Sequence, residues 1–508
     1  MDRQVRRLGL ALTALFLLLF AQLSYAQVFG ADRIANNPAN AARELIAEYG
    51  VDRGPILAAD GTTVLALSRG SRGRLVYLRR YPQGPLYSGI TGFYSLVYGR
   101  TGLEQAMNPY LSGDAPELAT QTLSDLVLGR PKKGGAVVTT IVPSLQQAAA
   151  RALANQPGGV VALNPQTGDI LASYANPTYD PNPLSSQDPA TIRRTWAQLN
   201  ADSSHPLVNG ADAALFPPGS TFKLVTAAAA LQNGQTPATR YPNPHTLDLP
   251  LTSQTIENFG GETCPGGTTT DLLTAFTYSC NVIFGEVGLK VGASKLAEQA
   301  HAFGFCATNP PQQTTCEEPT VPVSPFPAGQ FFASGRFPVA EYFRERDPEV
   351  AISAIGQDND LSNPLQMALV GAAIANDGVE MAPRLVTEVR DASGRIVKQF
   401  PPRTFGRPIS EQTAQALTQM MVAVVDHGTG TFAQIPGVTV AGKTGTAQHG
   451  EGAAPHAWFV SFAPAENPQI VVAVVVLDGG SIGSEATGGH VAAPIAKQVI
   501  ETYLGSNG

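Results

Sequence analysis

Apolar runs alternate with polar and turn-forming stretches along this chain, and the longest apolar run lies near its N-terminus. Residues 8–26 are almost wholly apolar and follow a short segment that carries Arg3, Arg6 and Arg7. A run of this length spans a bilayer as one helix, and flanking arginines stay on the cytoplasmic side. We therefore predict that residues 1–33 form a cytoplasmic stub and a transmembrane anchor, with the rest of the chain outside the cytoplasm.

A cleaved signal peptide is the alternative interpretation of this N-terminal segment. Ser24-Tyr25-Ala26 is a small-residue sequence of the kind at which a signal peptide is cleaved. The apolar run is longer than the core of a typical signal peptide, which favours an uncleaved anchor. Both interpretations place the remainder of the chain on the outer side of the membrane.

Short apolar runs bounded by turn residues predict strands at both ends of the region 151–508. The predicted strands cover residues 160–163, 169–174, 438–441, 457–462 and 470–477. The first two are joined by residues 164–168, whose proline and glycine predict a hairpin. Because residues 470–477 have no polar face, we expect helices on both sides of this sheet, one of them at 490–504. Helical segments are predicted to dominate from the hairpin to about residue 425.

Residues 34–150 are predicted to form a separate N-terminal module. Residues 53–57 predict a strand, and Asp60-Gly61-Thr62 predicts the turn that follows it. Residues 137–141 form a β-branched strand pattern, and residues 143–153 predict a helix that leads into the next domain. The sequence of this module offers no nucleophile paired with a base, so we expect a pedestal or a docking and dimerisation role.

A buried helix is predicted where Phe216-Pro217-Pro218-Gly219 gives way to an apolar, alanine-rich segment that ends at Asn233-Gly234. Ser220 and Lys223 are three residues apart, so they share one face of its first turn. A serine there faces the positive end of the helix dipole, and a lysine held in apolar surroundings can lose its proton. By itself, however, a serine cap followed by a lysine is more often structural than catalytic.

Composition excludes several classes of function. The 508 residues allow two or three domains, and hydrophobic content of 43% with 14% charged residues indicates a globular protein. The net charge of −7 argues against nucleic acid as a partner. The sequence contains neither a phosphate-binding glycine loop nor a His/Cys metal signature, so we predict no cofactor and no metal. His449 and His456 are interpreted as loop histidines without a catalytic role.

Four cysteines, at positions 264, 280, 306 and 316, lie within one region of the chain. An even number of cysteines in an exported protein indicates disulfides. The sequence allows three connectivities, of which we prefer Cys264–Cys280 with Cys306–Cys316, because these residues are neighbours along the chain. Four free thiols remain the alternative.

Two further motifs follow the Ser220-x-x-Lys223 pattern in order. They are Ser279-Cys280-Asn281 and, near the end of the chain, Lys443-Thr444-Gly445-Thr446. This ordered set is shared by penicillin-binding proteins and serine β-lactamases. From anchor to final helix the chain resembles class B penicillin-binding proteins, most closely the actinobacterial penicillin-binding protein A type. In its N-terminal module, residues 53–62 and 99–104 carry the resemblance.

The resemblance implies an α+β fold. A membrane-anchored, non-catalytic N-terminal module is expected to precede a serine D,D-transpeptidase domain of the β-lactamase-like kind at 151–508. That domain has an antiparallel sheet covered by helices and a mostly helical second lobe. The strand that carries Lys443 is expected at the edge of the sheet, facing the serine.

The resemblance also implies a role for each matching residue of the first two motifs. Ser220 would form the acyl-enzyme and Lys223 would act as its base. Ser279 would relay protons toward the leaving amine, and Asn281 would hydrogen-bond the amide of the substrate. The chain departs from the family at Cys280, where another small or polar residue is more common, and a disulfide there would tether the loop that carries Ser279 and Asn281.

The third motif is expected to bind the substrate. Lys443 would supply positive charge for the substrate carboxylate, and Thr444 and Thr446 would offer hydroxyl groups. Gly445 would allow the substrate backbone to approach closely. The backbone N–H groups of Ser220 and Thr446 would form an oxyanion hole.

The function implied is cross-linking of peptidoglycan stem peptides that end in D-Ala-D-Ala, with β-lactams as inhibitors. A separate membrane glycosyltransferase and other division or elongation proteins are the expected partners, at the outer face of the cell membrane. A D,D-carboxypeptidase and a β-lactamase remain open within the enzyme class. A non-catalytic scaffold of the division machinery and a β-lactam sensor remain open outside it.

Overall fold

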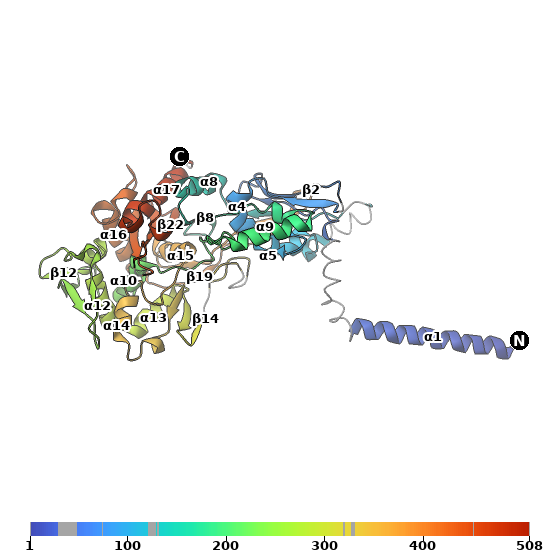
Figure 1. Ribbon diagram of the computed structural model, residues 1–508, viewed down its shortest axis with the longest axis horizontal. Helices are drawn as coiled ribbons and strands as arrows, with labels where there is room; N and C mark the ends of the chain where they lie inside the picture. Colours follow the sequence, from blue (N-terminus) through green and yellow to red (C-terminus); the bar gives the residue numbers. More distant parts are fainter. Residues whose placement is uncertain are drawn as a thin grey trace.

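The computed structural model describes residues 2–28, 48–73, 75–119, 129, 132–317, 321–326, 331–450 and 452–506. Its first helix, α1 (Asp2–Val28), covers the apolar run at 8–26. Among the described residues, no helix combines the length and the apolar character needed to cross a membrane. The remaining elements form a mixed structure of helices and sheets (Figure 1).

Five antiparallel strands form the central sheet, in the order β20-β21-β22-β7-β8. They are β7 (Gly158–Leu163), β8 (Ile170–Asn176), β20 (Ala441–Ala447), β21 (His456–Ala463) and β22 (Ile470–Val476). The predicted hairpin and the strands predicted at 457–462 and 470–477 are confirmed. The strand predicted at 438–441 is wrong: pairing with β21 begins at Ala441 and runs to Ala447, whereas Val438 closes a turn with Ile435.

Both faces of the central sheet are buried, as predicted. The even-numbered residues of β22 pack in one apolar cluster with α8 (Pro143–Leu153) and α17 (Ala493–Ser506). The odd-numbered residues of β22 pack in a second cluster with α15 (Pro364–Ala375). Figure 1 shows α17 and α15 on opposite sides of β22. Because successive side chains of a strand point to opposite faces, this one continuous apolar run contributes to two apolar clusters.

Helices and short strands together form the second lobe, which carries much of the site. Its helices are α10 (Lys223–Gln232), α11 (Leu272–Thr277), α12 (Asn281–Val291), α13 (Ala293–Ala302) and α14 (Asp347–Ser353), with α16 (Glu411–His427) after them. Helix α9 (Pro189–Ala201) lies instead beside the N-terminal elements, where Trp196 stacks on Tyr98 (Figure 1). Its short strands are β9 (Arg240–Pro242), β10 (Thr246–Asp248), β11 (Thr255–Glu257), β12 (Thr269–Asp271), β13 (Cys306–Asn309), β14 (Gln313–Glu317), β15 (Arg336–Pro338), β16 (Glu380–Met381) and β19 (Thr404–Gly406). The prediction that helices dominate here missed these strands, because runs of two to five residues are too short to show a period.

The second large sheet joins segments from distant parts of the chain, in the order β18-β17-β6-β1-β2-β3. Its strands are β1 (Ile56–Leu57), β2 (Val64–Gly70), β3 (Tyr77–Arg80), β6 (Ala136–Thr139), β17 (Val386–Arg390) and β18 (Ile396–Gln399), and short helices α4 (Gly84–Thr91), α5 (Gly102–Ala106) and α6 (Asn108–Leu111) accompany them. Strand β17 pairs with β6, so that Val389 lies opposite Val137. This sheet therefore contains strands from both sides of the boundary that we predicted at residue 150.

A buried ion cluster holds the N-terminal elements together. The carboxylate of Glu104, on α5, accepts hydrogen bonds from Arg53 Nε at 2.7 Å, Arg79 Nε at 2.5 Å and the hydroxyl of Tyr81 at 3.2 Å. Burial raises the pKa of Glu104, but the charges of Arg79 and Arg53 outweigh it and hold that pKa below its usual range. The carboxylate therefore stays ionised between two guanidinium groups.

Candidate active site

Ser220 lies in a single turn of 3-10 helix, η3 (Gly219–Phe222), which continues directly into α10. Every residue of α10 from Lys223 to Ala230 is buried, as its all-round apolar pattern predicted. The helix ends before Gly234, which has a positive φ of 87°. The predicted helix is thus present, with a first turn that is tighter than an α-helix.

Two glycines let strand β20 lie directly against the turn that carries Ser220. Gly219 has a φ of +52°, and a β-carbon at this position would lie 2.8 Å from the carbonyl oxygen of Thr446. A β-carbon on Gly445 would lie 3.0 Å from the carbonyl oxygen of Pro218. Both approaches are closer than an ordinary van der Waals contact. The absence of side chains therefore brings the third motif beside Ser220.

Lys223 is fully buried, and its amine points toward the second motif. Its Nζ donates hydrogen bonds to Ser279 O and to Asn281 Oδ1, both at 2.7 Å, and lies 3.4 Å from Ser279 Oγ. Burial lowers the pKa of Lys223 well below its ordinary value, and the charge of Lys443 lowers it further. A neutral amine that can accept a proton is what a general base requires.

Lys443 is the second buried amine of the site. Its Nζ donates hydrogen bonds to Ser279 Oγ and to Thr444 O, each at 2.9 Å. Burial lowers the pKa of Lys443 to about 7. This lysine therefore loses its proton at a lower pH than an exposed lysine would, and it changes charge near neutrality.

The hydroxyl of Ser279 lies between these two amines. It is 2.9 Å from Lys443 Nζ and 3.4 Å from Lys223 Nζ. A hydroxyl can accept one hydrogen bond and donate another, so it can accept from a charged Lys443 while donating to a neutral Lys223. Ser279 has a φ of +59°, a conformation that is rare for serine and costs free energy. Such a residue persists only where the surrounding structure holds it.

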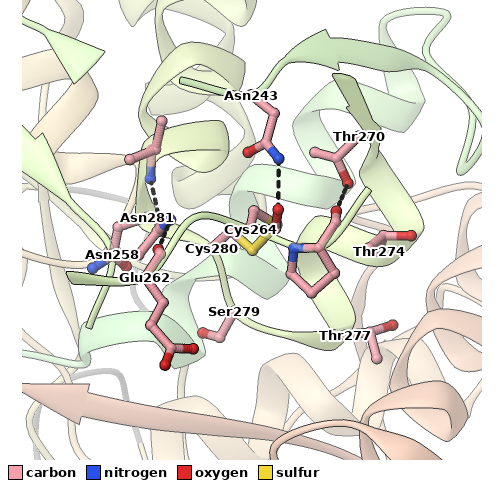
Figure 2. Close-up of a disulfide and its surroundings, with 12 residues drawn as sticks. Asn243, Asn258, Glu262, Cys264, Thr270, Thr274, Thr277, Ser279, Cys280 and Asn281 are labelled. Atoms are coloured by element: carbon pink, nitrogen blue, oxygen red, sulfur yellow. Dashed lines mark hydrogen bonds between the residues drawn. A yellow bond between two sulfur atoms is a disulfide. The ribbon is translucent and has the colours of Figure 1, made fainter. Parts of the chain in front are cut away.

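A disulfide holds the loop at this strained position. The structure contains Cys264–Cys280 and Cys306–Cys316, which is the pairing that we preferred. Cys280 is the residue before α12 and lies between Ser279 and Asn281 in the sequence, as Figure 2 shows. Asn243, the residue after β9, donates a 2.5 Å hydrogen bond from Nδ2 to Cys264 O, which holds the other cysteine of the disulfide in place.

The structure brings the predicted nucleophile and base together on neighbouring elements, but it joins them by no hydrogen bond. Within the described part of the chain, no hydrogen bond involves Ser220 Oγ. The amine of Lys223 is engaged instead by the oxygens of Ser279 and Asn281. Hydrogen bonds between catalytic groups often form only when substrate is present, so Lys223 must turn toward Ser220 for the predicted proton transfer.

The threonines of the third motif have different surroundings. Thr444 is nearly buried, and its Oγ1 shares a 2.6 Å hydrogen bond with Thr429 Oγ1. Thr446 is half-buried, on the part of β20 that faces the Ser220 turn. Thr429 is a site neighbour that was not among the predicted site residues. Only the pairing of two distant segments reveals this contact.

Comparison with known proteins identifies the family. Residues 158–501 match the penicillin-binding protein transpeptidase domain, and residues 53–137 match the penicillin-binding protein A dimerisation domain. The chain belongs to the penicillin-binding protein transpeptidase family. Within it, this penicillin-binding protein is a class B member of the penicillin-binding protein A type, which confirms the resemblance seen in the sequence.

Individual relatives cover almost the whole penicillin-binding protein. It is 41% identical over 512 residues to the peptidoglycan D,D-transpeptidase PbpA of Mycolicibacterium smegmatis, with 99% of each chain covered. Identity to PbpA of Mycobacterium tuberculosis is 38%, again over 99% of each chain.

Solved structures agree with this family assignment. The ceftriaxone acyl-enzyme complex of penicillin-binding protein A from M. tuberculosis aligns with a TM-score of 0.80 at 38% identity, over 90% of this chain and all of that chain. The D,D-transpeptidase domain of a peptidoglycan glycosyltransferase from Eggerthella lenta aligns with a TM-score of 0.75 at 33% identity, over 90% and 99% of the two chains.

Proposed function

We propose that this penicillin-binding protein is a peptidoglycan D,D-transpeptidase that forms an acyl-enzyme on Ser220. The observation that carries the proposal is the position of the Ser279 hydroxyl between the amines of Lys223 and Lys443, next to the turn of Ser220. This arrangement supplies a nucleophile, a neutral amine to take its proton and a relay toward the leaving group. The names and acyl-enzyme states of the relatives support the same chemistry.

Acylation would proceed in two steps. Lys223 Nζ takes the proton of Ser220 Oγ while that oxygen forms a bond to the carbonyl carbon of the penultimate D-alanine. The carbonyl electron pair moves onto oxygen, where the backbone N–H groups of Ser220 and Thr446 would stabilise it. When the pair returns, the C–N bond to the terminal D-alanine breaks. The leaving nitrogen takes a proton from Ser279 Oγ, which Lys223 replaces.

Transfer to the acceptor reverses these proton movements. The amine of a second stem peptide attacks the acyl carbon and gives its proton through Ser279 to Lys223. The bond to Ser220 Oγ then breaks, and the oxygen regains a proton. A β-lactam would acylate Ser220 by opening of its ring amide, but its leaving nitrogen stays attached and obstructs the acceptor.

Substrate recognition is assigned to the third motif and to Asn281. Lys443, with Thr444 and Thr446, would bind the terminal carboxylate, and Gly445 would leave room for the peptide backbone along β20. Asn281 Oδ1 accepts from Lys223, and its Nδ2 donates to Glu257 O at 3.1 Å. To hydrogen-bond a substrate amide, Asn281 would have to exchange one of these partners.

Attachment to the membrane is part of the proposal. The apolar run at 8–26 and its preceding arginines support one N-terminal span with the catalytic domain outside the cytoplasm. Partners would then be stem peptides, a separate membrane glycosyltransferase and other division or elongation proteins. Retention of the full chain in membranes washed with alkaline carbonate tests the span, and release comparable to that of a chain lacking residues 1–28 would reject it.

Labelling with fluorescent penicillin, followed by intact-mass measurement, tests the nucleophile. We expect one adduct on the wild-type chain and none on Ser220→Ala, with unchanged thermal unfolding. An adduct on the variant would move the nucleophile elsewhere. Incubation with a D-Ala-D-Ala stem peptide and an amine acceptor then separates the activities: a transpeptidase yields the cross-linked dimer, whereas a D,D-carboxypeptidase yields only the hydrolysed peptide.

A further inference from the structure

Two histidines and an aspartate converge at the edge of the central sheet, outside the motif residues. His449 lies in the loop after β20, His456 begins β21, and Asp478 lies in the turn after β22. One ligand atom from each, two ring nitrogens and a carboxylate oxygen, lie within 4.8 Å of one another. We interpreted both histidines as loop residues without a catalytic role, but His456 is the first residue of β21, and Asp478, 22 residues further along the chain, lies beside it. The ladder of adjacent strands brings the three together.

We propose that these three residues bind one Zn²⁺ ion. Imidazole nitrogen and carboxylate oxygen are ligands that zinc prefers, whereas magnesium and calcium favour sites made of oxygen alone. Three protein ligands leave a fourth position for water. His449 and His456 lie at the connection between β20 and β21, whereas Asp478 follows β22, so the ion would link this connection to the end of β22.

The distances between the ligand atoms agree with tetrahedral zinc. His449 Nε2 is 2.9 Å from Asp478 Oδ1, and His456 Nδ1 is 3.7 Å from the same oxygen. Bonds of about 2.0–2.1 Å at tetrahedral angles place two ligand atoms about 3.3 Å apart. The two observed separations lie on either side of that value, so small side-chain movements suffice. The imidazole rings are stacked, with centroids 3.9 Å apart, and a tilt of one ring would direct both nitrogens toward the same point.

Zinc would replace hydrogen bonds that both histidine nitrogens make now. Asp478 has a positive φ of 51°, and its backbone N–H donates a 3.2 Å hydrogen bond to His456 Nδ1. The lone pair of that nitrogen therefore accepts this hydrogen bond, which zinc would have to displace. His449 Nε2–H donates to the carbonyl of Ala454 at 2.9 Å as well as to Asp478. To bind zinc through Nε2, His449 moves this proton to Nδ1 through solvent, so no net proton is lost from the ring.

The site lies next to the first and third motifs, those of Ser220 and Lys443. Ala447, the last residue of β20, pairs with His456, so the loop between them leaves directly from the strand that carries Lys443 and Thr446. The ring of His456 also packs edge-on against Phe216, 5.6 Å between centroids, at the start of the Ser220 segment. A bound ion would therefore restrain the loop at one end of the substrate-binding strand.

Zinc binding to the purified full-length chain in detergent, without an affinity tag, tests the proposal. After treatment with a chelator and its removal, we expect one equivalent of Zn²⁺ by isothermal titration and by elemental analysis, and none of Mg²⁺. The side chain of His449 is partly exposed and that of Asp478 is exposed, and asparagine tolerates positive φ, so His449→Ala and Asp478→Asn should both fold. Each should bind zinc at least about tenfold more weakly, in line with losses seen when support around a metal is removed.

His245→Ala is the matched control, since His245 is exposed and lies outside this cluster. It should bind zinc as the wild type does. Zinc should also raise the unfolding temperature of the wild type and of this control, and leave that of Asp478→Asn unchanged. Absence of zinc binding to the wild type, or equal affinity in all four proteins, would overturn the proposal and leave the histidines as a packed pair.

Discussion

Lys223 and Lys443 carry the two amines of the site, and their surroundings separate their tasks. Lys223 is buried among oxygens of the second motif and lies near the charge of Lys443, so its pKa falls the further of the two. Lys443 lies on β20, where a substrate carboxylate would arrive. Because Ser279 contacts both amines, a proton can pass along one short path. Lys223 can therefore act as the base while it is neutral, and Lys443 can bind the substrate carboxylate while it is charged.

Replacement of Lys223 by arginine tests the base. A guanidinium group keeps its proton at any physiological pH, so Lys223→Arg should acylate with penicillin about 10²-fold or more slowly. The measurement is the second-order rate constant for acylation by a fluorescent penicillin. Lys290→Arg, a substitution in α12 on an exposed side chain, is the control and should acylate normally. A wild-type rate for Lys223→Arg would place the base elsewhere.

The pH dependence of acylation should report Lys443. Its pKa of about 7 predicts that the second-order rate constant falls as the pH rises through 7, because the charge that binds the substrate carboxylate is lost. The ascending limb, from loss of the proton on Lys223, should lie at lower pH. In Lys443→Arg the charge persists, so the descending limb near pH 7 should vanish even if acylation is weaker. A descending limb that stays in this variant would assign it to another group.

The same pKa has a consequence for stability with a definite sign. Between about 7 and the ordinary lysine value of about 10.4, the unfolded chain holds a proton on Lys443 that the folded chain has released. Since the unfolded state binds more protons in this window, the contribution of Lys443 to the free energy of unfolding rises with pH across it.

The loop between α11 and α12 is the element on which the second motif depends. Ser279 holds a positive φ between two helices, and the next residue, Cys280, is bonded to Cys264. The helices and the disulfide together restrain a conformation that serine rarely adopts. The second disulfide, Cys306–Cys316, involves β13 and β14, away from these motif residues. The two bridges therefore provide a matched comparison.

Loss of the Cys264–Cys280 disulfide should slow acylation. Either bridge closes a short loop and contributes about 3 kcal/mol in the chain-entropy model, so Cys264→Ser/Cys280→Ser and Cys306→Ser/Cys316→Ser should lose similar stability. Only the first pair frees the segment that carries Ser279 and Asn281. We expect its acylation rate to fall more than its stability implies, as measured with penicillin below the unfolding temperature. Equal acylation rates in the two double variants would mean that the Cys264–Cys280 disulfide stabilises the fold without affecting catalysis.

The whole molecule is linked by the six-stranded sheet, which takes β17 and β18 from a segment more than 240 residues beyond β6. A further contact joins the six-stranded sheet to the central sheet, since Arg384, just before β17, pairs with Asp169, just before β8. Shared strands cannot separate without exposing backbone groups and apolar side chains. We therefore expect the N-terminal module and the transpeptidase domain to unfold together.

Glu104→Gln, a substitution in the N-terminal module, tests whether this module and the transpeptidase domain unfold together. It leaves Arg53 and Arg79 buried without a counter-charge, which should cost about 3–5 kcal/mol. Glu341→Gln removes an exposed ion pair with Arg344 and should cost at most about 1 kcal/mol. The unfolding midpoints are measured by heating each variant.

The two tryptophans of the chain report on its two parts. Trp196 stacks on Tyr98 of the N-terminal module, and Trp458 is buried in the central sheet. Chains that retain only one tryptophan, by replacement of the other with phenylalanine, should show the same lowered midpoint in the Glu104→Gln background. A shift seen by Trp196 alone would mean that the two parts unfold independently.

The sequence by itself determined the chemistry and many of the elements. The ordered motifs at Ser220, Ser279 and Lys443 identified the family, because the reaction demands those side chains whatever lies between them. The helix at 143–153 and the apolar strand at 470–477 followed from local periodicity, which depends only on neighbouring residues. For the four cysteines the sequence left three pairings and four free thiols open, and the structure contains the preferred pairing of chain neighbours.

Only the tertiary structure decided how distant segments meet. Ser279 contacts two lysines that are far from it in the sequence, and β17 and β18 complete the N-terminal sheet from a distant segment. His449, His456 and Asp478 also meet although many residues separate them in the chain. Apart from β1 and β6, which overlap the strands predicted at 53–57 and 137–141, strands shorter than six residues escaped prediction for a related reason, since their hydrogen bonds go to partners elsewhere in the chain. Local pattern determines what a segment can form, whereas burial and pairing determine what it touches and hence the charge state of each amine in the site.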